Sequence, residues 1–123
     1  MALTVSALTA NGDVSDVFVC KGVNDGSGAA ATIRCGFKPR VVEVWNETDV
    51  IKFEYFQGMA DAYAFKLNGT GPVISEITSN GVTLDDGTGT VTTATGSAST
   101  GAGFVLGTGI LVASKTYWIK AIR

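Results

Sequence analysis

The residues that could do chemistry in this chain are carboxylates and thiols. The sequence has eleven Asp and Glu residues, two cysteines and no histidine. Because histidine is the usual general base near neutral pH and a very common metal ligand, its absence excludes Ser-His-Asp triads, Cys-His pairs and zinc sites of the ordinary kinds. The chemistry left open is a glycosidase-type pair of carboxylates or a calcium site built from oxygen ligands.

Glu43 and Glu54 are the carboxylates best placed to form such a pair, because they are expected to lie near each other across a hairpin. Two segments resemble fragments of calcium loops, Asp85-Asp86-Gly87-Thr88-Gly89 and Asn24-Asp25-Gly26. Neither has the full spacing of a calcium loop, and Asp-Gly is common in ordinary hairpins. We therefore expect Glu43 and Glu54 to form a solvated face with Lys52, and we predict no catalytic residue, no metal and no cofactor.

The two cysteines, Cys20 and Cys35, have no histidine to activate them as nucleophiles. A hairpin centred on Gly26 would place Cys20 opposite Thr32 and Cys35 opposite Val17, so the two thiols would not face each other. The sequence predicts two free, half-buried thiols rather than a disulfide.

Length and composition predict one folded domain over residues 1–123. Hydrophobic residues make up 46% of the chain, charged residues 16%, and the formal net charge is -2. The basic residues form no stripe that could neutralise a run of phosphates, so nucleic acid is not expected as a partner. The first residues lack the features of a signal peptide and no run of eighteen apolar residues occurs, which predicts a soluble protein made in the cytoplasm, with no membrane partner.

Short β-prone runs separated by Gly, Asn and Asp dominate the sequence, and helical periodicity is absent beyond a few residues. Turn signals recur at intervals of roughly eight to twelve residues, as in sandwiches and barrels. We predict an all-β fold, a single antiparallel β-sandwich related to the jelly roll or Greek key, with about eight to ten strands. The predicted strands cover 3–8, 14–21, 29–34, 40–46, 50–56, 63–67, 73–78, 82–84 and 116–122, and the apolar runs 104–106 and 110–112 precede the last of them.

Several connections are predicted from turn residues. Residues 24–28 should form the tip of a hairpin between the second and third strands, and residues 79–81 should form a turn. Residues 40–56 should form a central hairpin, because they hold most of the bulky side chains. Residues 87–103 are nearly all Gly, Thr, Ser and Ala, so they are expected on the surface as a strand with loops.

Large aromatic residues fall on faces that also carry charges, namely Trp45, Phe56 and Trp118. They are either surface positions that bind a sugar or a protein partner, or core positions in a sheet covered on both sides. Because the chain has few charges and its strands carry apolar residues on both faces, we expect one face to be buried in an oligomer or larger assembly.

The order of several motifs resembles a family of small tailed-bacteriophage proteins, the head decoration or cement proteins. The resemblance covers most of residues 36–123 and is carried by Gly36-Phe37-Lys38-Pro39-Arg40-Val41-Val42, Val44-Trp45-Asn46-Glu47-Thr48-Asp49, Phe53-Glu54-Tyr55-Phe56-Gln57-Gly58-Met59, Gly81-Val82-Thr83-Leu84, Gly103-Phe104-Val105-Leu106-Gly107 and Ser114-Lys115-Thr116-Tyr117-Trp118-Ile119-Lys120-Ala121. It implies a capsid-binding β-sandwich, commonly a homotrimer, that sits on the outer surface of the virion head. There it would join neighbouring subunits of the major capsid protein, and the family offers no catalytic residues to carry over.

Two other functions stay open. A similar order of motifs occurs in domains that resemble phage tail-fibre tips, which implies a receptor-binding or carbohydrate-binding β-sandwich module. A glycan hydrolase fragment would need Glu43 or Glu54 to act in catalysis. The loops are rich in Gly, Thr and Ser rather than in aromatic and acidic residues, which favours the structural function over sugar binding.

A cement protein is expected to bind through a large shared area and many copies rather than one strong site. The predicted capsid or subunit contacts are Leu3, Val5, Phe37, Lys38, Pro39, Arg40, Trp45, Met59 and Tyr63. Residues 1–12 are expected to serve as an assembly arm or an edge strand that pairs with a neighbouring chain. The alternatives are a buried turn residue for Phe37 and an ordinary surface charge for Arg40.

Overall fold

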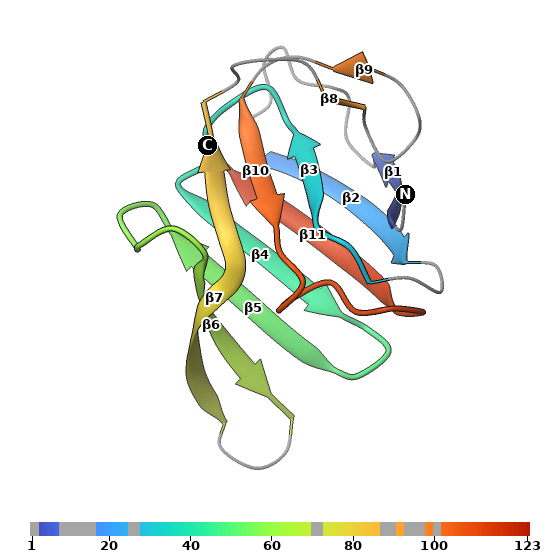
Figure 1. Ribbon diagram of the computed structural model, residues 1–123, viewed down its shortest axis with the longest axis vertical. Helices are drawn as coiled ribbons and strands as arrows, with labels where there is room; N and C mark the ends of the chain where they lie inside the picture. Colours follow the sequence, from blue (N-terminus) through green and yellow to red (C-terminus); the bar gives the residue numbers. More distant parts are fainter. Residues whose placement is uncertain are drawn as a thin grey trace.

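The computed structural model describes residues 17–24, 28–69, 73–86 and 102–123 with their side chains, and the backbone of residues 3–7, 91–92 and 98–99. All regular structure in these residues is β-strand (Figure 1). The strands are β1 Leu3–Ala7, β2 Val17–Asn24, β3 Ala31–Arg34, β4 Val41–Asn46, β5 Ile51–Phe56, β6 Tyr63–Asn68, β7 Ile74–Asp85, β8 Val91–Thr92, β9 Ala98–Ser99, β10 Gly103–Leu106 and β11 Thr116–Ile122. The prediction of an all-β fold is confirmed.

Nine of these strands form one antiparallel sheet in the order β1-β2-β11-β4-β5-β6-β7-β10-β3, and β8 pairs with β9 separately. A sandwich would have two sheets, whereas here hydrogen-bonded ladders connect the nine strands continuously. The sheet curls, so that β7, β10 and β3 lie across from β4, β11 and β2 (Figure 1). Side chains from both halves belong to a single hydrophobic cluster, which shows that the core lies inside the curl.

The central hairpin is confirmed. β4 and β5 are antiparallel neighbours, with Val42 opposite Tyr55 and Val44 opposite Phe53. All four side chains are buried in the core, while the residues between them point to the other side of the sheet. This is the alternation expected of strands with one face packed on the core.

The predicted hairpin at residues 24–28 is wrong. β2 pairs with β1 and β11, and β3 pairs with β10. β11 supplies seven register partners to β2, whereas β3 has only four residues to offer. The long C-terminal strand therefore takes the place that the local turn signal assigned to β3, and Cys20 lies opposite Ile119 instead of Thr32. Residues 25–27 lie outside the described part of the chain.

The predicted turn at residues 79–81 is also wrong, because β7 runs through it as one strand of 12 residues. The turn signal instead marks an irregularity in the pairing of β6 with β7, where the register shifts between Tyr63 and Ala64. Asn80 has a φ of 57°, in the left-handed region that Asn tolerates. A Cβ on Gly81 would lie 2.7 Å from the carbonyl oxygen of Ala62, so this bend requires glycine.

The apolar run at residues 110–112 lies in a buried turn between β10 and β11. Ile110 and Leu111 are buried in the core. The hydroxyl of Tyr117 donates a hydrogen bond to the carbonyl oxygen of Ile110 (2.9 Å) and accepts one from the amide of Val112 (2.7 Å). Most of the small-residue segment 87–103, which is predicted to lie on the surface, is outside the described residues.

Both cysteines are free and buried, as predicted for the absence of a disulfide. Burial, together with the nearby Cys35 thiol, raises the pKa of the Cys20 thiol to about 12. Burial also raises the pKa of Cys35, whose Sγ donates a hydrogen bond to the carbonyl oxygen of Phe37 at 3.2 Å. Because the thiolate is the nucleophile, both side chains are core residues rather than reactive groups.

Candidate functional site

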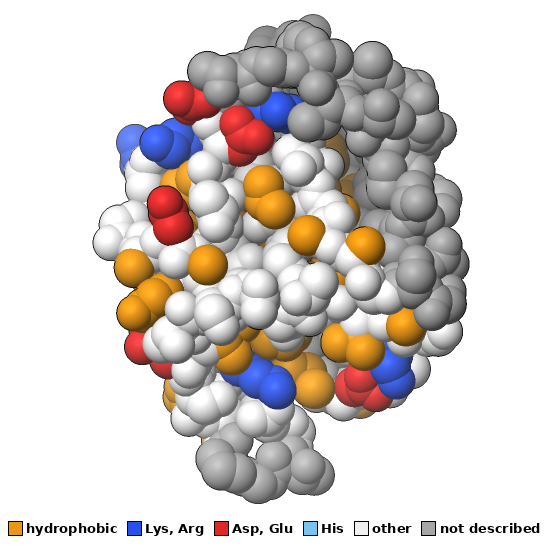
Figure 2. Space-filling model, viewed as in Figure 1, with side chains coloured by type: hydrophobic (Ala, Val, Ile, Leu, Met, Phe, Trp, Pro, Cys, Tyr) orange, Lys and Arg blue, Asp and Glu red, His pale blue; other side chains and the backbone are white. Residues whose placement is uncertain are grey.

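The outward side of strands β2, β11, β4, β5 and β6 is the most distinctive surface of the protein, and we call it the outer face. Its side chains alternate with the core residues along each strand and are half-buried or exposed. The outer face comprises Val17, Val19, Lys21, Val41, Glu43, Trp45, Lys52, Glu54, Phe56, Phe65, Leu67, Trp118, Lys120 and Ile122. The β7–β10 side of the molecule differs, because apolar side chains there are scattered among polar atoms and charges lie toward the rim (Figure 2).

The strand registers arrange these residues in rows across the sheet. The first row, which we call the aromatic row, runs from Lys21 through Trp118, Trp45 and Lys52 to Leu67. The amino group of Lys21 lies 5.5 Å from the ring centroid of Trp118, and that of Lys52 lies 4.7 Å from the ring centroid of Trp45. Each tryptophan is therefore held by a cation–π contact with a neighbouring strand.

The second row, which we call the charged row, holds both carboxylates of the outer face and runs in order across the sheet through Val19, Lys120, Glu43, Glu54 and Phe65. Glu43 and Glu54 are direct register partners, as the sequence predicted. Like charges in this position repel each other, so the row depends on lysines for neutralisation.

The third row is apolar and consists of Val17, Ile122, Val41 and Phe56. Phe56 is 43% exposed and meets Phe65 of the second row edge to face, with ring centroids 6.3 Å apart. The charged row thus lies between the aromatic row, which includes two lysines, and an apolar row. This is an amphipathic pattern on a sheet whose other side packs on the core.

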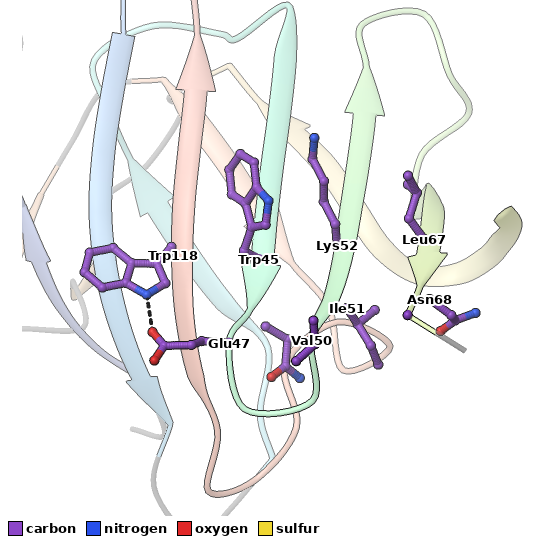
Figure 3. Close-up of a pocket in the computed structure, with 10 residues that line it drawn as sticks. Trp45, Glu47, Val50, Ile51, Lys52, Leu67, Asn68 and Trp118 are labelled. Atoms are coloured by element: carbon purple, nitrogen blue, oxygen red, sulfur yellow. Dashed lines mark hydrogen bonds between the residues drawn. The ribbon is translucent and has the colours of Figure 1, made fainter. Parts of the chain in front are cut away.

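A groove of about 560 Å³ opens at the aromatic row, next to the β4–β5 turn (Figure 3). Its lining is mostly apolar and includes both tryptophans of the chain. The indole N–H of Trp118 donates a hydrogen bond to a carboxylate oxygen of Glu47, which holds this ring at the edge of the groove (Figure 3). The complete lining is Trp45, Asn46, Glu47, Val50, Ile51, Lys52, Leu67, Asn68, Gly69 and Trp118.

The β4–β5 turn beside the groove is shaped by Asn46. Its side-chain oxygen accepts a hydrogen bond from the backbone amide of Asp49 (3.0 Å), and its Nδ2 donates one to the carboxylate of Asp49 (3.1 Å). The turn ends at Val50, which has a φ of 57° and is 72% exposed. A β-branched residue in the left-handed region is strained. Val50 therefore has an exposed apolar side chain on a backbone conformation that valine rarely adopts.

The predicted contact residues do not gather in one place. Trp45 lies on the outer face and lines the groove. Phe37 and Pro39 are buried, and Phe37 lies under the guanidinium of Arg123, whose carbon is 5.6 Å from the ring centroid. This burial agrees with the alternative of a buried turn residue.

The remaining predicted contacts lie elsewhere on the molecule. Lys38 and Arg40 are exposed beside Phe37, while Met59 and Tyr63 are half-buried in and after the β5–β6 connection. The side chains of Leu3 and Val5 lie outside the described part of the structure, but the backbone places β1 at one end of the nine-stranded sheet.

Glu43, Glu54 and Lys52 form an ion cluster on the outer face. The amino group of Lys52 lies 3.7 Å from a carboxylate oxygen of Glu43 and 3.4 Å from one of Glu54. Within the described residues, no group of three or more Cys, Asp or Glu side chains could hold a metal ion. The same residues include no helix of the length and apolarity needed to cross a membrane.

The sequence prediction missed Lys120 and Glu47 as parts of this surface. The alternation of the last strand places Trp118 and Lys120 on the same side, and this signal was available. Their positions beside Trp45 and Glu43 follow only from the pairing of β11 with β4, which the sequence did not reveal.

Fold and surface together define an all-β protein with an extended amphipathic sheet face and an aromatic groove. Comparisons with protein-family profiles, with curated proteins and with solved structures give no match to this chain.

Proposed function

We propose that this protein is a structural, non-enzymatic decoration protein of a tailed-bacteriophage head. It would be made in the host cytoplasm, bind the outer surface of the head as a homo-oligomer, for which the resemblance implies a trimer, and join neighbouring subunits of the major capsid protein. The order of motifs over residues 36–121 is the support for the capsid as partner.

The observation that carries a binding function is the outer face itself. Five neighbouring strands present apolar and aromatic side chains on the side opposite the core, including Trp45, Trp118 and Phe56. Exposed apolar residues also occur at strand ends, with Val50 in the β4–β5 turn 72% exposed and Ile74 at the start of β7 66% exposed. Contiguous apolar surface of this kind is typical of proteins that bury it against a partner.

The neutralised carboxylates support a non-enzymatic function. A general acid or nucleophile of a glycosidase needs a free carboxyl group directed at substrate. Glu43 and Glu54 instead share the amino group of Lys52, at 3.7 Å and 3.4 Å. A structural surface needs only that the charges be balanced.

The test is to mix the purified protein with expanded heads that lack it and to locate it by electron microscopy. We expect occupancy at regular positions of the capsid lattice. Protein that stays in solution, or that covers the heads without lattice order, would contradict the proposal. The variant Lys66→Glu should occupy the same lattice positions as the wild type, because the side chain of Lys66 lies on the opposite side of β6 from Phe65 and Leu67.

The second candidate is a receptor-binding or carbohydrate-binding module, and the groove of Trp45 and Trp118 is the observation that favours it. Indole rings stack on the apolar faces of sugars, and a groove of about 560 Å³ has the size of a ligand site. Both tryptophans of the chain line this groove. Titration with soluble oligosaccharides should then shift the tryptophan fluorescence, and an unchanged spectrum excludes the groove as a sugar site.

A further inference from the structure

We propose that the outer face pairs with the outer face of a second copy of this chain, around a two-fold axis that runs along β4. The proposal rests on the strand registers and charges and does not depend on the capsid function, and it differs from the trimer that the resemblance implies. Binding to heads and pairing of two copies can each fail while the other holds.

The order of the strands makes such an axis geometrically natural. β4 is the middle of the five strands that carry the outer face, with β11 and β2 on one side and β5 and β6 on the other. Two sheets would pack face to face with a two-fold axis between them that runs along β4. The rotation leaves each row at the same height along the axis, and it moves the strands on one side of β4 to the other side. β11 then faces β5 of the second copy, and β2 faces β6. Packed sheets lie about 10 Å apart with their strand directions within about 30° of each other, so parallel β4 strands fall within this range and the rows near the axis face each other in contact.

The charged row is complementary under this operation. Lys120 of one copy faces Glu54 of the other, and the reverse pair forms on the opposite side of the axis. Opposite charges in both pairs favour this register over a shifted one.

The aromatic and apolar rows are complementary as well. Trp118 faces Lys52 of the second copy, a pair of the same kind as the contact between Lys52 and Trp45 within one chain. Ile122 faces Phe56 of the second copy, so two apolar side chains meet near each end of the third row.

The residues of β4 itself lie on the axis and meet their own copies. For Val41 and Trp45 this places apolar groups together. Glu43 would meet a second Glu43, but each has the Lys52 amino group at 3.7 Å, and Lys120 is its register partner on β11. The Lys52 amino groups therefore reduce the repulsion between the like charges on the axis.

The size of the face fits a specific but small interface. Five strands spaced about 4.8 Å apart and six residues rising about 3.3 Å each give a projected area of roughly 500 Å². Aromatic side chains that project from the sheet make the accessible area larger than the projected area. The accessible area then approaches the roughly 600 Å² per partner of small specific interfaces. An affinity of micromolar order is the expectation.

A second copy fits the groove better than a sugar, because the polar groups at its edge already have partners. Asn46 is hydrogen-bonded to Asp49, and Glu47 accepts from Trp118. Lys52 lies within 4 Å of two carboxylates. Few groups remain to bind sugar hydroxyls, whereas an apolar lining suits the side chains of another protein face.

The test is a charge reversal with rescue in a mixture, read by sedimentation. The wild-type protein should have twice the chain mass of 12.7 kDa at roughly 200 µM and dissociate on dilution. Lys120→Glu and Glu54→Lys should each raise the dissociation constant by about tenfold or more, because each creates two like-charged pairs. Mixing the two variants should restore the dimer, because both pairs across the axis are then opposite again. Defects within either chain persist in the mixture and cannot produce this rescue.

Tryptophan fluorescence locates the contact. Both tryptophans lie on the outer face, so emission should shift to the blue as the dimer forms and should not depend on concentration in Lys120→Glu alone. The matched control is Lys66→Glu, which reverses a lysine on the other side of β6 and should dimerise as the wild type does. A wild-type monomer or trimer at the highest concentration overturns the proposal, as does a mixture that stays monomeric.

Discussion

Glu43 and Glu54 are direct cross-strand partners, and one amino group, that of Lys52, lies within 4 Å of both carboxylates. The same amino group lies over the ring of Trp45 at 4.7 Å. Lys52 therefore connects the charged row of the outer face with the aromatic row.

Replacement of Lys52 by Met should destabilise the protein by about 1 kcal/mol. It leaves Glu43 and Glu54 facing each other without a cation and removes the contact with Trp45. The measurement is urea unfolding at low and at high salt, because salt screens the repulsion between the carboxylates. Lys52→Arg keeps the charge and should stay near the wild type, and equal stability of the Met and Arg variants at low salt would contradict this account.

Gly103→Ala should destabilise the protein by about 3 kcal/mol or abolish folding. Gly103 pairs with Arg34 on one side and with Asp85 on the other, and their side chains form an ion pair at 3.0 Å. A Cβ at this position would lie 1.9 Å from the carbonyl oxygen of Ile33, which is backbone and cannot move aside. Thermal unfolding measures the effect.

The control for Gly103 is Gly28→Ala, because the nearest atoms to a Cβ there are 3.7 Å away. That variant should unfold within a few degrees of the wild type. Equal melting temperatures for the two alanine variants would show that β10 does not approach β3 as closely as the structure has it.

Tyr117→Phe should lower the free energy of unfolding by about 2 kcal/mol. Its hydroxyl is the partner of two backbone groups in the buried turn, the carbonyl of Ile110 and the amide of Val112. Removal of the hydroxyl leaves both without a bond, and an unsatisfied buried group costs about 1 kcal/mol or more. The comparison is Tyr55→Phe, which removes one hydrogen bond, to the carbonyl of Met59 at 2.8 Å. Denaturant unfolding should rank the Tyr117 variant below the Tyr55 variant, and the reverse order would refute the assignment.

Stability should fall as pH rises above about 9. The pKa of the Cys20 thiol is about 12 in the folded protein, against 9.0 for an exposed thiol. The unfolded chain therefore loses this proton first, so unfolding becomes more favourable between about pH 9 and 12, by about 1.4 kcal/mol per pH unit for one fully titrating thiol. Below about pH 9 the thiol is protonated in both states and adds no pH dependence.

Chemical unfolding between pH 8 and 11 measures this slope in the wild type and in Cys20→Ala. The variant should show a shallower decline, whatever its absolute stability, because one of the two buried thiols is gone. Cys35 still contributes to the decline in stability in this variant, because burial raises its pKa too. Burial also raises the pKa of Tyr55 and of Tyr117, so both tyrosines contribute to the decline as well. Identical slopes would rule out Cys20 as a source.

Much of the fold was predictable where it depends on neighbours in the chain. The β4–β5 hairpin and its two faces follow from alternation between Val42 and Tyr55, because side chains of a strand point alternately to opposite sides. The predictions failed where a turn signal competed with a distant strand. Residues 24–28 look like a hairpin tip, but β2 finds more partners in β11 than in β3.

The sequence by itself determined which side chains share a face within each strand, since that depends only on the period of two along the backbone. The alternation puts Trp45 and Glu43 on the same side of one strand, and it puts Trp118 and Lys120 on the same side of another. Only the tertiary structure decided that these two pairs lie side by side, because the pairing of β11 with β4 joins residues far apart in the chain. Long-range pairing depends on the packing of the whole sheet around one core, and no local pattern encodes it. The rows of the outer face, the groove and the proposed two-fold contact all follow from that pairing.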